Sequence, residues 1–393
     1  MARSKGKSGN AFNDVAIVGV GQTPYHKNPE LPTLWYLVEA VRLALANAGL
    51  EKNDVDGLAV SSFLLPPDNT ATVAEQMGME LRWGYLGAFG GAAHVIGVLR
   101  AAHAIQQGEA EVIVVVAADA FSVASHHVMM NSFNTGMRDY LAPYGMGGTT
   151  GLFAMLERRH SYEFGTTREQ LGKIAVIQRA NACLNPNALF RTPMSLDDYL
   201  NARLICDPLR LYDCPLPCGG GEAVVLTTTE RAKKLRNTPI RILAGGERTN
   251  HRPDDFIMLE SGWSQFATQM FSDAGLKHSD VDLVEVYDDY PIMVVIQLED
   301  LGFCAKGDGG RFVADTDISL HGSLPLNTGG GQLSCGQSGA GGGGLGLTEA
   351  VIQLQGAAGE RQVKDAEVAV VSGFGMVGFV KGLCQSSVIL TNE

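Results

Sequence analysis

The sequence contains no stretch of about 18 uninterrupted apolar residues, the length that a membrane-spanning helix requires. Basic residues are few: 30 Lys and Arg stand against 42 Asp and Glu, which gives 393 residues a net charge of −12. An acidic chain without a basic block is poorly suited to nucleic acid. Residues 1–12 carry basic side chains with no apolar run behind them, so we expect a loose tail and no secretory signal. We therefore expect no membrane or nucleic-acid partner.

Cysteine is scarce and scattered. The seven cysteines are an odd number, and although Cys214 and Cys218 read C-x₃-C, no second pair of ligands follows them. The spacing therefore predicts no metal site. Free thiols in a reducing compartment are the simpler interpretation, and we expect a cytoplasmic protein. With 45% hydrophobic residues, the chain can bury a large core in two to three domain-sized units.

Glycine, by contrast, is abundant, with 48 residues that are unevenly distributed. One glycine-rich run spans residues 327–346. A flexible linker is one interpretation of such a run. However, an apolar helical pattern (Leu347, Ala350, Val351, Leu354) follows it directly. The pattern favours a segment whose backbone packs closely against another part of the chain.

The chain also repeats itself. The segment AGLEKNDVD at 48–56 recurs as AGLKHSDVD at 274–282, and in each copy a glycine ends a helical pattern. The segment AEVIVV at 110–115 recurs as AEVAVV at 366–371. We predict strands at 15–20, 57–61, 240–244 and 283–286, and glycine-led helices near 90–107 and 341–356. Two repeated pairs in the same order indicate a duplicated β-α-β-α-β unit.

Apolar strands that alternate with helices predict an α/β fold whose parallel sheets are covered on both faces. We divide the chain into an N-terminal half, 1–238, and a C-terminal half, 239–393. The first half contains an insertion at about 121–216 that is rich in Met, Tyr, Asn and Pro. We expect this insertion to form a loop domain over the site, with Tyr140 and Tyr144 as candidates to line an apolar pocket.

A duplicated unit with this glycine run resembles the thiolase superfamily over nearly the whole chain. The closest resemblance is to the sterol-carrier-type thiolases and their lipid-transfer and aldolase relatives. It implies a layered α-β-α-β-α sandwich and a coenzyme A thioester as substrate, with no cofactor. In thiolases a nucleophilic Cys opens the central helix of the first half. Here that position falls on Gly91, within one residue, and no Cys, Ser or Thr lies in that range.

Three further segments resemble thiolase motifs but replace their reactive side chains. Glu285-Val-Tyr-Asp-Asp-Tyr290 is similar to N-E-A-F or H-D-x-F, with Tyr287 in place of the Asn or His. The segment 327–338 is similar to N-P-S-G-G…S-x-G-H-P, with Gln337 in place of the oxyanion-hole His. Residues 372–378 are similar to C-x-G-G-G, with Ser372 or Gly373 in place of the acid/base Cys. The resemblance implies oxyanion or substrate binding at six positions: Gly91, Ala92, Asn327, Gly336, Ser338 and Gly375.

Without the Cys, a thiolase-like site can still stabilise the enolate of an acyl-CoA. Backbone N–H groups at glycine-led helix starts, 91–93 and 336–340, are the expected donors. An enolate without an acyl-enzyme suits an aldol or retro-aldol step on a β-hydroxyacyl-CoA. Tyr287 is the first candidate for its acid/base group if amide donors lower its pKa, and Tyr290 is the second. Gln337 would donate to the thioester oxygen, and Cys335 is a further acid/base candidate.

Two alternatives stay open at this stage. One is an acyltransferase that performs a thiolase-type Claisen reaction with a displaced nucleophile such as Cys335. The other is a non-catalytic carrier of acyl-CoA or lipid. The resemblance also implies a homodimer and a small zinc-ribbon/OB-fold partner protein, which together would form a heterotetramer. The residues leave open the direction of the reaction and whether the acyl group is a steroid or an aromatic side chain.

Overall fold

Nine strands form one mixed sheet in the order β3-β2-β4-β7-β1-β8-β11-β10-β9. The computed structural model describes residues 12–131, 133–252, 254–379 and 381–392, so residues 1–11 of the expected N-terminal tail lie outside the described residues, while Phe12 is buried in the core. The strands are β1 (Val15–Gln22), β2 (Gly57–Ser61), β3 (Trp83–Leu86), β4 (Val112–Ala120), β7 (Gly219–Thr228), β8 (Ile240–Thr249), β9 (Leu283–Glu285), β10 (Val368–Gly378) and β11 (Lys381–Thr391).

The strand order repeats in the two parts of the sheet. β2, β4, β7 and β1 follow one another in the first part, and β9, β10, β11 and β8 follow one another in the second. The two parts meet where β1 pairs with β8, through only two residue pairs, Ala16 with Arg241 and Ile17 with Ile240. The strands predicted from the repeated segments are present, and Gly49 and Gly275 end their helices at φ angles of 73° and 70°.

The expectation of parallel sheets is wrong for much of the molecule. Within the described residues, β2 pairs in parallel with β3 and β4, and β9 pairs in parallel with β10. The strands β7 and β11 run antiparallel to both of their neighbours. The alternation of strands and helices indicates sheets but does not give strand direction. β11 follows β10 after a short turn, which forces an antiparallel pair.

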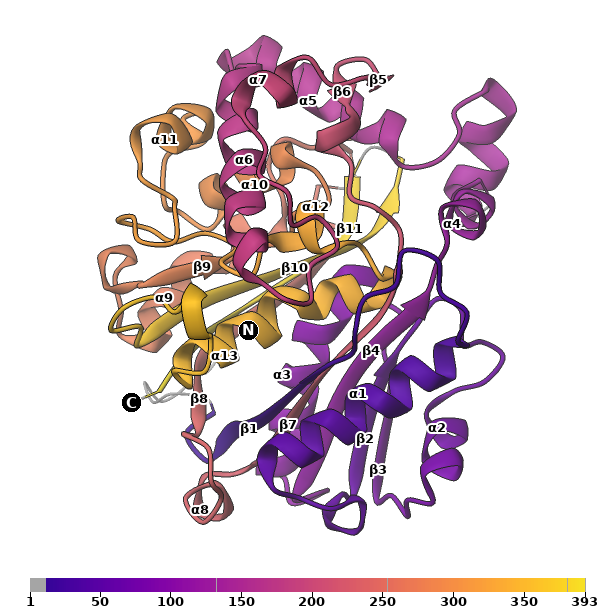
Figure 1. The fold of residues 1–393 in the computed structure, drawn as a ribbon, viewed down its shortest axis with the longest axis vertical. Helices are drawn as coiled ribbons and strands as arrows, with labels where there is room; N and C mark the ends of the chain where they lie inside the picture. Colours follow the sequence, from indigo (N-terminus) through magenta and orange to yellow (C-terminus); the bar gives the residue numbers. More distant parts are fainter. Residues whose placement is uncertain (1–11, 132, 253, 380, 393) are drawn as a thin grey trace, which may run out of the picture.

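Helices cover and separate the two parts of the sheet (Figure 1). α1 (Thr33–Ala48) packs on the outer face of the first part. α3 (Ala93–Gln106) and α13 (Leu345–Leu354) share one apolar core with strands of both parts. α9 (Ala267–Ala274) and α10 (Pro291–Asp300) pack on the outer face of the second part. This arrangement is the layered α-β-α-β-α sandwich that the sequence predicts.

The segment 121–216 is largely helical and lies at one end of the molecule (Figure 1). It contains α4 (Val123–Met130), η3 (Gly136–Leu141), α5 (Thr150–Phe164), α6 (Arg168–Leu184), α7 (Leu196–Leu200) and the strand pair β5 (Leu204–Cys206) and β6 (Leu209–Arg210). α5 and α6 pack against α10, while α6 also contacts α11 (Gly309–Asp315) and α12 (Gly331–Cys335). These contacts bring the segment over the ends of β9 and β10. None of the described helices has the length and apolar character needed to cross a bilayer.

Candidate active site

A cavity of about 340 Å³ lies where segments from distant parts of the chain converge. Its wall combines the loop after β9, the end of β10 and the turn before α3 with α4 and the start of α5. Much of the lining is apolar, including Met129, Met130, Phe133, Phe153 and Phe374. The polar groups that line it belong to residues of several types, namely His126, His127, Thr149, Thr150, Cys214, Tyr287, Asp289, Tyr290 and Gln337. The cavity therefore has the form of a site for an apolar ligand with a few polar contacts.

Gly91 lies on the cavity wall at the start of α3, but it has no room for a side chain. A Cβ atom added there would lie 2.1 Å from Cε2 and 2.5 Å from Cζ of Tyr287. It would also lie 2.5 Å from the carbonyl oxygen of Phe374. The Tyr287 ring thus occupies the space into which a side chain at position 91 would project. Gly375, also on the wall, packs as closely, since its Cβ would lie 2.1 Å from the Phe89 oxygen.

Tyr287 is held through its backbone by Gln297 of α10. The Tyr287 N–H donates to Gln297 Oε1 at 3.2 Å, and Gln297 Nε2 donates to the Tyr287 carbonyl at 2.5 Å. The Ser372 hydroxyl donates to the same Oε1 at 2.7 Å. Sequence reasoning missed Gln297, because nothing in a run of helical residues marks one glutamine as a clamp for a neighbouring loop.

The pKa of Tyr287 departs from the sequence-based expectation. Burial raises this pKa well above its ordinary value, and Asp289 adds to the rise. The Gln337 and Gln332 side chains act in the opposite direction, as expected for amide donors, but they do not prevail. The condition that amide donors lower the pKa of Tyr287 is therefore not met. This hydroxyl is therefore suited to donate a proton rather than to act as a phenolate.

Tyr290 also lines the cavity, and its surroundings differ from those of Tyr287. Its hydroxyl lies 3.0 Å from the Thr150 hydroxyl, and its ring stacks on Phe153 with centroids 4.3 Å apart. Burial raises the pKa of Tyr290 above its ordinary range, and Cys214 contributes to the rise. A hydroxyl already paired with Thr150 is suited to position a ligand.

Gln337 reaches the cavity from a loop whose amides are mostly engaged elsewhere. The Gln337 N–H donates to the Leu216 carbonyl at 2.8 Å, and the Gly336 N–H donates to the Gln332 carbonyl at 3.0 Å. The Ala340 N–H donates to the buried Asp119 carboxylate at 2.8 Å. The second of the two predicted amide clusters, 336–340, is thus largely unavailable to a ligand. Of the first cluster, 91–93, only Gly91 lines the cavity, while the Ala92 and Ala93 N–H groups donate to the Phe89 and Gly90 carbonyls.

Asn327 holds the backbone just before Tyr287 in place. It adopts a left-handed conformation (φ 46°), and its Oδ1 accepts a hydrogen bond of 2.8 Å from the Val286 N–H, just before Tyr287. The adjacent Thr328 donates through its N–H and its hydroxyl to Glu285 at 2.9 and 2.6 Å. These bonds attach the loop after β9 to the glycine-rich loop. Asn327 borders a small neighbouring cavity rather than the main one.

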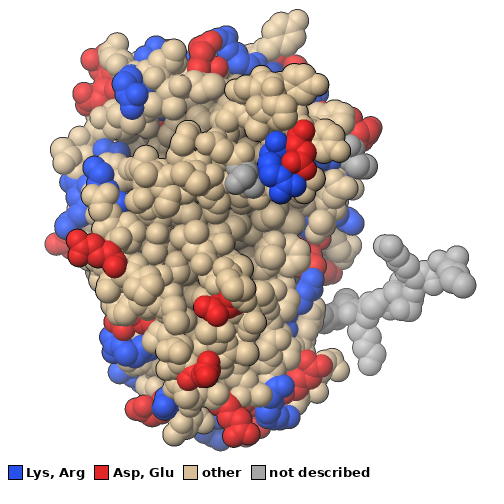
Figure 2. Space-filling model, turned by 90° about the vertical axis from the view of Figure 1, so that its right-hand side faces the viewer, with Lys and Arg blue, Asp and Glu red and all other residues tan. Residues whose placement is uncertain are grey.

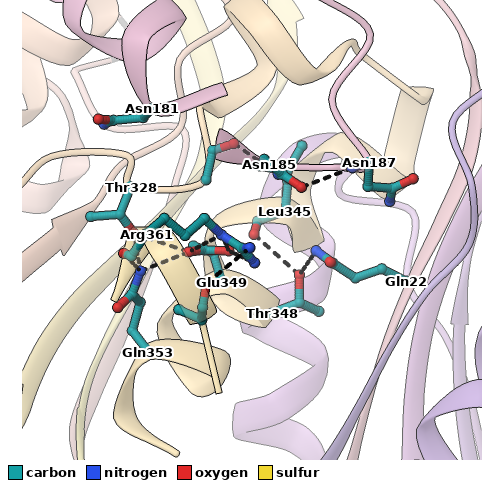
Figure 3. Close-up of polar contacts among 12 residues, drawn as sticks. Gln22, Asn181, Asn185, Asn187, Thr328, Leu345, Thr348, Glu349, Gln353 and Arg361 are labelled. Atoms are coloured by element: carbon teal, nitrogen blue, oxygen red, sulfur yellow. Dashed lines mark hydrogen bonds and ion pairs between the residues drawn. The ribbon is translucent and has the colours of Figure 1, made fainter. Parts of the chain in front are cut away.

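A buried polar network extends from Thr328 beneath these loops (Figure 3). The Thr328 hydroxyl lies 3.2 Å from Glu349 Oε1, and Gln353 Nε2 donates to the same oxygen at 2.9 Å. The Arg361 guanidinium forms an ion pair of 3.0 Å with Glu349 Oε2. Burial raises the pKa of Glu285 well above its ordinary value, and Glu349 contributes to the rise. The network rigidly connects α13 to the loop that carries Asn327.

Several predicted residues do not reach the main cavity. Cys335 is fully buried, and its Sγ donates to the Gly329 carbonyl at 3.0 Å. Burial, followed by Glu349, raises the pKa of its thiol well above the ordinary value. Tyr140 and Tyr144 are 60% and 89% exposed and are absent from the cavity wall, so the prediction that they line it is wrong. Ala92, Gly336 and Ser338 are buried and do not belong to the cavity wall; a Cβ added at Gly336 would meet the Cys218 and Leu189 side chains.

Across the described part of the chain, no three His, Cys, Asp or Glu side chains gather closely enough to hold a metal ion. Cys214 borders the cavity while Cys218 is buried, and both are free thiols.

The known proteins that this chain is similar to agree with one another in kind. Residues 246–391 match the family described as "Thiolase C-terminal domain-like". A steroid side-chain-cleaving aldolase of Thermomonospora curvata is 35% identical over 339 residues, which cover 81% of this chain and 85% of that protein. The 17-hydroxy-3-oxo-4-pregnene-20-carboxyl-CoA lyase of Mycobacterium tuberculosis is 34% identical over 336 residues, covering 81% and 86%. The solved structure named "Ltp2-ChsH2(DUF35) aldolase" superposes with a TM-score of 0.85 at 33% identity, covering 96% of this chain and 98% of that one.

Proposed function

This chain belongs to the thiolase superfamily, and we propose that it is a carbon–carbon lyase that cleaves a β-hydroxyacyl-CoA by a retro-aldol reaction, or forms it in reverse. The substrate would lose its β-hydroxyl proton while the Cα–Cβ bond breaks. The products are a ketone and a shortened acyl-CoA. The acyl-CoA forms first as its enolate, which then takes up a proton at Cα. No cofactor is needed, because the thioester itself accepts the electron pair.

The position of the Tyr287 ring carries this proposal. A thiolase holds one acyl group on Cys, yet the corresponding position here is Gly91, and Tyr287 fills the space of its side chain. An acyl-enzyme at this position is therefore sterically excluded as long as Tyr287 stays in place. What the site keeps is the means to stabilise an enolate. The turn before α3 borders the cavity through Gly90 and Gly91, and Gln337 supplies a side-chain amide.

The cavity favours an apolar acyl group. Methionine and phenylalanine side chains form much of its wall, and no Lys or Arg occurs among the described residues that line it. The two relatives reported above are named for steroid substrates, which agrees with a bulky polycyclic group. We propose a steroid side-chain thioester as the first substrate to test and an aromatic thioester as the second.

The quaternary structure is part of the proposal. The matched aldolase structure carries DUF35 in its name, which supports a small partner protein of the zinc-ribbon/OB-fold kind. Figure 2 shows a face on the side of α4 and the β3 edge whose centre has few charged residues. Leu86, at the end of β3, is 45% exposed. We propose that two copies of the chain meet at the β3 edge and form a heterotetramer with two partner proteins.

The seven free cysteines support a cytoplasmic location.

The decisive experiment mixes the purified chain, with and without its partner, with a β-hydroxyacyl-CoA that has a branched side chain. Mass spectrometry would follow the ketone, the shortened acyl-CoA and the mass of the intact protein. We expect both products and no acylated protein. A Tyr287→Phe variant, which keeps the ring over Gly91, should bind the thioester but lose turnover. Wild-type rates in that variant would contradict the role of Tyr287.

The acyltransferase alternative depends on Cys335, which lies in the core and donates to a backbone carbonyl. It predicts a protein-bound acyl group that Cys335→Ser abolishes. The carrier alternative predicts binding of the thioester without turnover, with every partner supplied. Either result would replace the lyase proposal.

A further inference from the structure

The two consecutive aspartates between the candidate tyrosines have different surroundings. Asp288 accepts hydrogen bonds from the Gln332 and Leu333 N–H groups at 2.8 and 3.2 Å. Its carboxylate also lies against the backbone of Gly331, where an added Cβ would come within 2.1 Å of Oδ2. Asp288 therefore has a structural task, since it caps the short helix α12 and holds the glycine-rich loop.

Asp289 has no such task. It lines the main cavity, only 6% of its surface is exposed, and its Oδ1 is buried without a hydrogen-bond partner. Among the residues that the structure describes, no Lys, Arg or His forms an ion pair with it. Burial of an unpaired carboxylate is costly, so a carboxyl group kept in this position needs a reason.

We infer that Asp289 is a further catalytic residue of this site, the group that takes the proton from the β-hydroxyl of the substrate and passes it on through Tyr287. The inference rests on the proposed retro-aldol function. It is carried by three observations: both side chains line one cavity, Asp288 is engaged elsewhere, and Oδ1 of Asp289 is buried there without a hydrogen-bond partner, its carboxyl group being bound only by the backbone N–H groups of Tyr290 and of Asp289 itself.

Every proton transfer in the proposed reaction takes place between the substrate, Asp289 and Tyr287. The Asp289 carboxylate takes the hydroxyl proton while the carbon–oxygen bond becomes a carbonyl and the Cα–Cβ bond breaks. The electron pair of that bond moves into the thioester enolate. The Tyr287 hydroxyl then gives its proton to Cα, and protonated Asp289 returns a proton to the Tyr287 phenolate. Cα thus receives the proton of Tyr287, the hydroxyl proton replaces it on Tyr287 by way of Asp289, and no net oxidation occurs.

The directions of the pKa shifts agree with the proposed roles of Asp289 and Tyr287. Burial raises the pKa of the Asp289 carboxyl well above its ordinary value, and Asp288 adds to the rise. A base with a raised pKa is better matched to an alcohol proton than an ordinary carboxylate is. Asp289 also contributes to the raised pKa of Tyr287, so the two groups interact. The other titratable groups on the cavity wall are His126, His127, Cys214 and Tyr290.

The test compares Asp289→Asn with Asp289→Glu in the complete protein, together with its partner if turnover requires one. We expect Asp289→Asn to lower kcat by about 10²–10⁴-fold. The KM should stay within a factor of about three, because binding of the thioester is not altered. Asp289→Glu should recover part of the loss. Asp315→Asn, the same change at an exposed position on α11, is the matched control and should not alter turnover.

The dependence of kcat/KM on pH separates a base from a structural residue. In the wild type, activity should rise with pH as Asp289 loses its proton, in a range above that of an ordinary carboxylate. Asp289→Asn should lack this rise in the activity that remains. An Asn variant within about fivefold of wild type would overturn the inference. So would a loss that Glu does not relieve and that follows a lowered melting temperature, since that result describes a structural residue.

The two levels of the proposal fail in different ways. If the wild type releases no ketone from any β-hydroxyacyl-CoA, the proposed function fails before any variant is compared. If the wild type turns over and Asp289→Asn keeps both its rate and its pH profile, only the role of Asp289 is wrong.

Discussion

The contact between Gly91 and Tyr287 leads to a quantitative prediction, because it joins the position expected for the thiolase nucleophile to the proposed acid/base tyrosine. Gly91→Ala adds one Cβ atom at 2.1 Å from Cε2 of Tyr287 and 2.5 Å from the Phe374 carbonyl oxygen. Carbon atoms in contact normally lie about 3.5–4.0 Å apart, so the ring must move by more than 1 Å or the backbone must shift. Forcing an extra carbon into a packed site costs about 1–3 kcal/mol.

The assay measures the thermal unfolding and the turnover rate of each variant. We expect Gly91→Ala to lower the free energy of unfolding by about 1–3 kcal/mol, which for a chain of 393 residues corresponds to roughly 1 °C in Tm for each kcal/mol. Turnover should fall with it, because Tyr287 loses its position against the substrate. Gly151→Ala in α5 is the matched control, since its Cβ would meet only the end of the flexible Met146 side chain, at 3.4 Å from Sδ. That variant should keep the wild-type stability and rate.

A second variant identifies the clashing atoms. Two of the three contacts shorter than 3 Å belong to Tyr287 and one belongs to a backbone oxygen. Gly91→Ala combined with Tyr287→Ala should therefore be more stable than the sum of the two single changes predicts. Additive effects would refute the reasoning. A Gly91→Ala protein with the melting temperature and turnover of the wild type would refute it outright.

Three further predictions concern the residues around the site. Asn327→Ala leaves the Val286 N–H without its 2.8 Å acceptor and should cost about 1–3 kcal/mol, measured by urea unfolding. Arg361→Met leaves Glu349 buried without its cation and should cost about 3–5 kcal/mol, whereas a double variant with Glu349→Leu should recover much of that loss in the same assay. Burial raises the pKa of Glu222 from 4.5 to about 7, so the folded protein keeps a proton that the unfolded chain releases as the pH rises through this window. The free energy of unfolding of the wild type should therefore fall between about pH 4.5 and 7 relative to Glu222→Gln, and parallel pH profiles would contradict this.

The order and type of the main elements follow from the amino-acid pattern, because they depend on local features. Repeated segments show the duplication, apolar runs indicate β1, β2, β4, β8, β9 and β10, and glycines mark the ends of α1 and α9. Strand direction depends on how the chain returns through space, and so the antiparallel β7 and β11 were not anticipated. The absence of a nucleophile at Gly91 is likewise a property of one position, which the sequence alone reveals.

The chemistry of the site depends on distances between residues that the chain separates widely. Only the folded structure brings the Tyr287 ring into the side-chain space of Gly91, across almost 200 positions. The opposite roles of Asp288 and Asp289 also arise from packing, since one faces backbone N–H groups of a distant loop and the other faces the cavity. Burial overturned the expectation of a lowered Tyr287 pKa, because desolvation exceeds the effect of two amide side chains. A residue type carries its donors and its charge in the sequence, whereas its solvation and its neighbours come only from tertiary packing.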